Sequence, residues 1–101
     1  MVAGVDIGTL IAQIAELDNG RPVIAGTRTS VRRVAVLYKQ GASAEDIARR
    51  LSHLSLAQVY AALAYYHANK DEIEAALAEE EAEYFRLAAL NSLEARQPIH
   101  E

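Results

Sequence analysis

The segment from Asp71 to Ala95 contains neither glycine nor proline and is rich in alanine and glutamate. Residues of these types favour a helix, and the next helix-breaking residue is Pro98. Apolar residues recur at about helical spacing in this segment, at Ile73, Leu77, Tyr84, Leu87 and Leu90. A helix this long and one-sided cannot be covered by the rest of so small a chain. We therefore expect it to bind a partner through its apolar stripe.

The charges divide the chain at the same place. Residues 1–70 carry eight Lys and Arg against five Asp and Glu, a net charge of +3, whereas residues 71–101 carry two against nine, a net charge of −7. A basic body suits a polyanion, and an acidic tail suits a basic protein surface. Two partners of opposite charge are the natural interpretation, and a solvated acidic helix without a partner is the alternative.

Composition excludes several classes of protein. A length of 101 residues suits one domain, and 51% hydrophobic residues exclude wholesale disorder. The chain has no cysteine, so it has neither a disulfide framework nor a cysteine-based zinc site. The first residues lack the features of a secretion signal, and no apolar run reaches the length of a membrane span. We expect a cytoplasmic protein that does not contact a membrane.

The N-terminal part predicts one helix and one strand. Apolar residues from Ile7 to Leu17 recur every three or four positions, which indicates a short amphipathic helix that ends at the turn Asp18-Asn19-Gly20. Val23 and Ile24 favour an extended backbone. The sequence offers no second strand nearby, and unpaired buried backbone groups are costly. We therefore predict that Val23 and Ile24 pair with the same strand of a second copy.

Three helices with clear capping signals follow. Ser30 precedes the first, and Gly41 stands where a helix C-terminal glycine is expected. Ser43 with Asp46 predicts a capping box for the second helix, and Ser55 with Gln58 predicts one for the third. The second and third helices, joined by a short turn, match a helix-turn-helix.

No pattern of catalytic residues is present. His53, His67 and His100 are scattered and form no i,i+4 pair, so they do not predict a metal site. No glycine-rich loop has the spacing of a phosphate-binding loop, and Glu45 and Asp46 fit the first turn of a helix. We expect no enzymatic activity and no cofactor.

Nucleic-acid binding fits the residues better. The arginines near the first two helices suit contacts with phosphate groups. The third helix would enter the groove, and it offers few polar side chains for reading bases. An alternative is that it serves mainly in packing and dimerisation. The predicted DNA-binding residues are Arg28, Arg32, Arg33, Arg49, Arg50, Ser55 and Gln58.

The run Pro22-Val23-Ile24-Ala25-Gly26-Thr27-Arg28 resembles the signature of the family catalogued as domain of unknown function 433. Ser43-Ala44-Glu45-Asp46-Ile47, Leu54-Ser55-Leu56 and Val59-Tyr60-Ala61-Ala62-Leu63 follow in the family's order. The resemblance implies an all-α, homeodomain-like helix-turn-helix fold and a homodimer. It also implies similarity to VapB antitoxins of type II toxin–antitoxin pairs, whose toxin is a PIN-like ribonuclease.

Together these observations predict three parts: an N-terminal helix at residues 1–19, a helix-turn-helix core with one short strand at 20–70, and an acidic helical tail at 71–101. The predicted function is an antitoxin that neutralises its toxin through the tail and represses its own operon by binding DNA. The alternatives are a stand-alone dimeric transcription regulator and an interaction module without nucleic acid. Tyr84 and Phe85 would anchor the toxin, and Arg86 or Arg96 would reach into its carboxylate cluster. The full set of predicted toxin-binding residues is Ile73, Leu77, Tyr84, Phe85, Arg86, Leu87 and Leu90.

Overall fold

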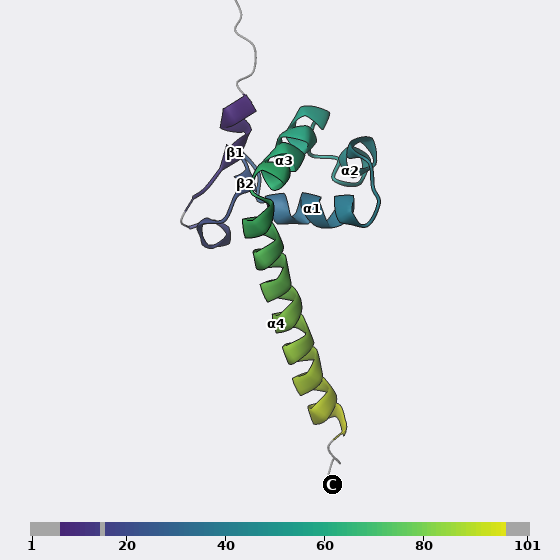
Figure 1. The fold of residues 1–101 in the computed structure, drawn as a ribbon. Coiled ribbons are helices and arrows are strands. Elements are labelled where there is room, and N and C mark those ends of the chain that lie inside the picture. Colours follow the sequence, from purple (N-terminus) through teal and green to yellow (C-terminus); the bar gives the residue numbers. More distant parts are fainter. Residues whose placement is uncertain (1–6, 15, 97–101) are drawn as a thin grey trace, which may run out of the picture. The chain divides into compact units, whose positions relative to one another are not determined.

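The computed structural model describes residues 7–14 and 16–96 of the chain. As the sequence predicted, this part is mostly helical with a small N-terminal β element (Figure 1). The chain divides into two compact units, residues 1–70 and residues 71–101. The elements follow in the order η1 (Ile7–Leu10), β1 (Ile11–Ala12), η2 (Asp18–Gly20), β2 (Val23–Ile24), α1 (Val31–Lys39), α2 (Ala44–Arg50), α3 (Leu56–Ala68) and α4 (Lys70–Arg96), where η denotes a 3-10 helix.

The predicted helix from Ile7 to Leu17 is wrong. A single 3-10 turn, η1, leads into β1, which pairs antiparallel with β2 so that Ile11 faces Ile24 and Ala12 faces Val23. A short isolated helix is marginal in water because its first turn is costly to form. The backbone of β2 offers this segment hydrogen bonds that local periodicity does not reveal. Residues 1–6 of the predicted N-terminal part, and Ala15, lie outside the described residues.

The predicted pairing of Val23 and Ile24 across a two-fold axis is also wrong, because both find partners within their own chain. On one side they pair with β1. On the other side, Val23 forms a bridge with Ser30, and the Ile24 amide donates to the Thr29 carbonyl at 2.9 Å. Both side chains are fully buried. Strand β2 therefore belongs to the core of the chain.

The predicted helix caps are confirmed. The Ser30 hydroxyl accepts from the Arg33 amide at 3.0 Å at the start of α1. Complete capping boxes begin α2 and α3. At the end of α1, the Gly41 amide donates to the Tyr38 carbonyl and the Ala42 amide to the Leu37 carbonyl, which is the Schellman arrangement. Gly41 has φ +102°, a conformation that favours glycine.

The core of residues 1–70 forms around α3, against which η1 and β1 pack as well as two helices. Helices α1 and α2 both pack against α3. The connection between α2 and α3 is short, so the two helices form the predicted helix-turn-helix. The fully buried side chains come from β2 and from all three helices, and include Ile24, Val31, Val34, Ile47 and Val59.

Candidate interaction surfaces

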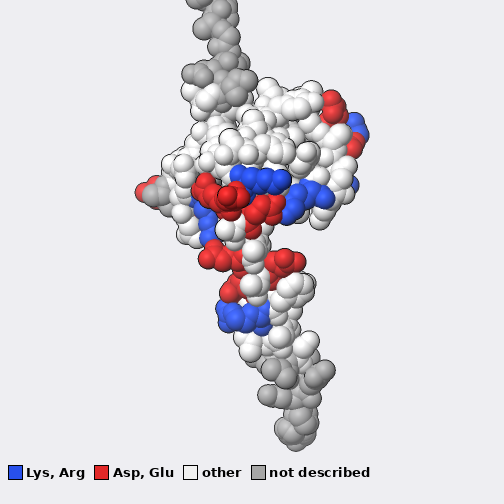
Figure 2. All heavy atoms as spheres, in the orientation of Figure 1, with Lys and Arg blue, Asp and Glu red and all other residues white. Residues whose placement is uncertain are grey.

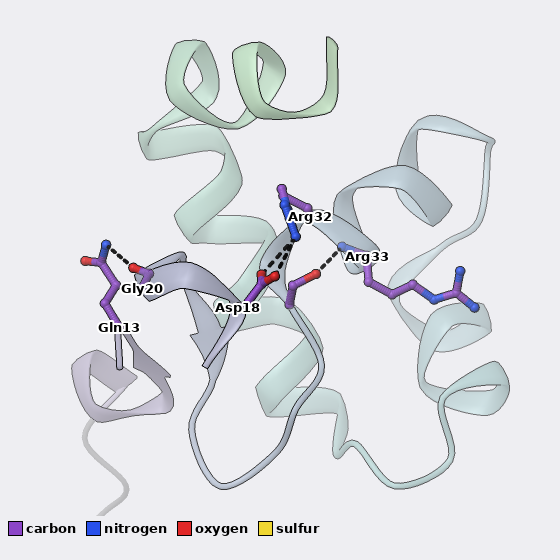
Figure 3. Close-up of polar contacts among 6 residues, drawn as sticks. Gln13, Asp18, Gly20, Arg32 and Arg33 are labelled. Atoms are coloured by element: carbon purple, nitrogen blue, oxygen red, sulfur yellow. Dashed lines mark hydrogen bonds and ion pairs between the residues drawn. The ribbon is translucent and has the colours of Figure 1, made fainter. Parts of the chain in front are cut away.

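Arg32, predicted to contact DNA, is a structural residue. Its side chain is only 8% exposed, and its Nη2 donates to both carboxylate oxygens of Asp18, at 2.8 and 3.1 Å (Figure 3). Asp18 lies in a left-handed turn, where its φ is 53°. The ion pair therefore ties this turn to α1. Arg32 is not available to a phosphate group, so its assignment as a DNA-binding residue is wrong.

The other four predicted arginines, Arg28, Arg33, Arg49 and Arg50, are exposed. In Figure 2 basic side chains gather over the region of α1. One of the four is engaged within the chain, since Arg49 forms an ion pair with Asp46. Exposed guanidinium groups suit phosphate contacts and carry no sequence information by themselves.

Asp46 has a second role beside this ion pair. Its carboxylate accepts a hydrogen bond from the Ser43 amide at 3.2 Å and so completes the capping box of α2. This bond is the main reason why the pKa of Asp46 lies below its ordinary value, with the Ser43 hydroxyl and the charges of Arg49 and Arg50 acting in the same direction.

Ser55 and Gln58, predicted as base readers, are used within the helix cap. The Gln58 side-chain oxygen accepts from the Ser55 amide at 2.7 Å, and the Ser55 hydroxyl accepts from the Gln58 amide at 3.1 Å. A side chain that leaves this arrangement to read a base exposes the one backbone donor that it caps. The structure thus gives both residues a capping role.

The outer face of α3 carries exposed apolar side chains, which bears on the alternative that this helix serves in packing and dimerisation. Leu56 is 40% exposed and Tyr60 is 52% exposed, and Ala64 lies exposed on the same side. The signal was present in the sequence, because residues 56–68 contain no Asp, Glu, Lys or Arg. A surface helix normally has a charged side facing solvent.

Helix α4 changes character along its length. Its first part is acidic, with seven Asp and Glu and no Lys or Arg among residues 71–83. The following part carries large apolar side chains that are all exposed: Tyr84 at 66%, Phe85 at 60%, Leu87 at 48% and Leu90 at 48%. The Tyr84 and Phe85 rings contact each other edge to face, with centroids 5.4 Å apart. Figure 2 shows the acidic side chains and the largely uncharged segment beyond them.

The remaining predicted toxin-binding residues differ in their exposure. Ile73 is only 1% exposed and Leu77 is partly buried. The role of Ile73 and Leu77 in binding a partner stays a prediction. Arg86 is exposed, and its guanidinium forms an ion pair with Glu83, one helical turn earlier. The large apolar side chains of α4 that are exposed thus begin at Tyr84.

The histidines and acidic residues of the described part of the chain do not gather into a metal site. Residues 7–14 and 16–96 contain no group of three or more His, Asp or Glu that could hold a metal ion. His53 lies in the turn before α3, and its Nε2 is hydrogen-bonded to the Thr29 hydroxyl at 2.6 Å. No helix in the same residues is long and apolar enough to cross a membrane.

Comparisons with known proteins give a family and a fold. The family model described as "Protein of unknown function (DUF433)" matches residues 11–66. Among solved structures, the chain is similar to a DUF433 member protein from Anabaena variabilis ATCC 29413, with a TM-score of 0.64 and 24% sequence identity over 69% of each chain. The search of curated proteins found no match.

Proposed function

The chain belongs to the DUF433 family of proteins of unknown function, and from this premise we propose that it is the antitoxin of a type II toxin–antitoxin pair. It acts in the cytoplasm by binding, without catalysis. Its toxin is a PIN-like ribonuclease. The family match ends at residue 66, so the evidence for a toxin-binding element comes from α4 itself.

The observation that carries the proposal is the exposed apolar segment of α4. Two aromatic rings and two leucines lie open to solvent within seven residues, Tyr84 to Leu90. Exposed apolar groups at this density mark a protein contact rather than an ordinary surface. Leu87 and Ala88 line a shallow depression with Tyr84, which gives the segment a shape that a partner can fill. A helix that places apolar side chains in a groove of its partner is a common mode of recognition.

The acidic residues before this segment indicate the charge of the partner. Seven carboxylates between Asp71 and Glu83 repel another acidic surface and attract a basic one. A ribonuclease has a basic face because it binds RNA phosphates. The acidic stretch would cover that face while Tyr84 and Phe85 anchor beside it. Arg86 would reach the carboxylates of the active site once it leaves Glu83.

The same charges weigh against pairing of two α4 helices. At heptad spacing with Tyr84 and Leu87, the next contact position toward the N-terminus is Glu80. In a parallel pair, two Glu80 carboxylates would face each other in the contact. This disfavours the alternative of a stand-alone regulator whose tail helices join its two copies.

DNA binding is the second part of the proposal. The exposed groups that support it are Arg28, Arg33, Arg49 and Arg50. They would bind phosphate groups of the operator and so repress the operon that encodes the pair. With Ser55 and Gln58 held in a cap, the affinity would rest on the backbone of the DNA.

Co-expression with the neighbouring small reading frames tests the proposal. The intact chain should co-purify with a nuclease and protect cells from it. Changing Tyr84 and Phe85 together to Ala should abolish both effects. Ile14→Ala is the control, because it removes another exposed large apolar side chain, 45% exposed, that lies outside α4. Co-purification that survives the double change, or that is lost equally with Ile14→Ala, would contradict the role of α4.

A further inference from the structure

Helix α3 is apolar on nearly all sides. Its inner side is buried, with Val59, Ala62 and Tyr66 all at most 2% exposed. On its outer side Leu56 and Tyr60 are 40% and 52% exposed, and no charged residue occurs in the helix. A helix that is apolar all round is normally covered all round. Its outer face is not covered within the described residues of the unit 1–70.

A groove of about 330 Å³ lies beside this face, between α3 and the N-terminal strand. The α3 side of the groove is built mainly from alanine, so another side chain or backbone could approach closely. The residues of the two walls that matter here are Ile11 and Ala12 from β1, and Ala61, Ala64, Tyr65 and Ala68 from α3.

Strand β1 lies at the edge of the sheet that the described residues form. It is one of the two strands of the sheet, and its partner β2 is bonded on its far side by Ser30. In the part of the chain that the structure describes, no strand lies on the other side of β1. An open strand edge readily pairs with a strand of another chain.

We propose that the outer face of α3, the groove and the edge strand β1 form the surface on which two copies of this chain meet. Because the α3 face has no charge, it can oppose itself without repulsion, and it offers no cation to DNA. The surface carries both a projecting ring, Tyr60, and a hollow beside Ala64. A two-fold axis would place the ring of each copy against the hollow of the other. Antiparallel pairing of two β1 strands has the same two-fold symmetry.

This inference goes beyond the proposed function, because it concerns the protein without toxin or DNA. The test is sedimentation of the purified full chain over a range of concentrations, where a dimer is expected. Ala64→Glu places a carboxylate at an exposed helical position, so the helix tolerates it. In the dimer this charge would be buried without a partner. The dissociation constant of the dimer should therefore rise at least about tenfold. Ala82→Glu, the same change at an exposed position of α4, is the control and should leave the dimer unchanged.

Tyr60→Ala is a second variant that adds no charge. It should also weaken the dimer, with circular dichroism confirming that the helices remain. A wild-type chain that is monomeric at every concentration would overturn the proposal. An Ala64→Glu dimer as strong as the wild-type dimer would also overturn it. The same holds if Ala82→Glu weakens the dimer as much as Ala64→Glu does. If the Ala64 variant does not fold, a dimer of unchanged strength in Tyr60→Ala is the overturning result.

Discussion

Arg32 Nη2 donates to both carboxylate oxygens of Asp18, and this contact joins the first turn of α1 to the left-handed turn between the two strands. Asp18 and Asn19 have φ of 53° and 57°, and Gly20 has φ 76°. Asp, Asn and Gly are the residues that adopt this conformation most readily. The arginine holds that turn in place, and the turn returns the chain from β1 to β2.

Replacing Arg32 with Ala should therefore destabilise the protein. The expected loss is about 1–3 kcal/mol in the free energy of unfolding, as for a hydrogen-bonded charged group. Arg33→Ala is the matched control, because the Arg33 side chain is exposed. Its replacement should change the free energy of unfolding by no more than about 0.5 kcal/mol. Urea unfolding followed by circular dichroism measures both. Equal effects of the two substitutions would show that the contact with Asp18 contributes little.

Arg32 and Arg33 should also differ in how much each contributes to DNA binding. Arg33→Ala should lower the slope of log affinity against log salt by about one, the value for one lost phosphate contact. Arg32→Ala should leave that slope unchanged wherever the variant is folded. Titrations of labelled duplex DNA at several salt concentrations provide the slopes. If Arg32→Ala lowers the slope and Arg33→Ala does not, the assignment of their roles is reversed.

Gln58→Glu tests whether the start of α3 reads bases. Glutamate can accept the same hydrogen bond from the Ser55 amide, so the capping box and the helix should persist. The ratio of affinities for operator and random DNA should then stay the same, because Gln58 makes no base contact. Competition between the two DNAs measures this ratio. A large fall of this ratio in a folded variant would indicate that α3 does enter a groove of the DNA and read bases there.

The stability conferred by Asp46 should depend on pH. Its pKa in the folded protein is lowered, chiefly by the hydrogen bond from the Ser43 amide, so the ionised form is favoured by folding. This contribution is fully present above the ordinary pKa of 3.8 and is lost as the pH falls through the lower folded value. The stability difference between wild type and Asp46→Asn should therefore be constant from neutral pH to about 5 and shrink below 4. A difference that grows on acidification would contradict this.

The acidic and apolar parts of α4 should affect different rates of toxin binding. Changing Glu79, Glu80 and Glu81 together to Gln should slow association about tenfold at low salt and leave dissociation nearly unchanged. Ending the chain after Glu83 should instead abolish stable binding, since it removes every exposed apolar anchor and retains the buried Ile73. Surface plasmon resonance with the captured toxin separates the two rates. Faster dissociation in the Gln variant would mean that the carboxylates themselves anchor the complex.

The helices and their ends could be read from the sequence because their signals are local. Ser30, Ser43 and Ser55 cap helices through hydrogen bonds to residues three positions ahead, and Gly41 ends α1 through its own backbone conformation. The long helix and the division of charge are likewise properties of contiguous sequence.

Only the tertiary structure decided which residues pair across the chain. Ile11 faces Ile24, and Arg32 binds Asp18, at sequence separations that periodicity does not reach. The same limit explains the errors in site residues, since a surface arginine and a buried, paired one have identical local sequence signals. The tertiary structure also showed that the large apolar side chains from Tyr84 to Leu90 are exposed. Hydrogen bonds close in sequence follow from residue types, whereas burial and distant pairing follow from how the whole chain packs.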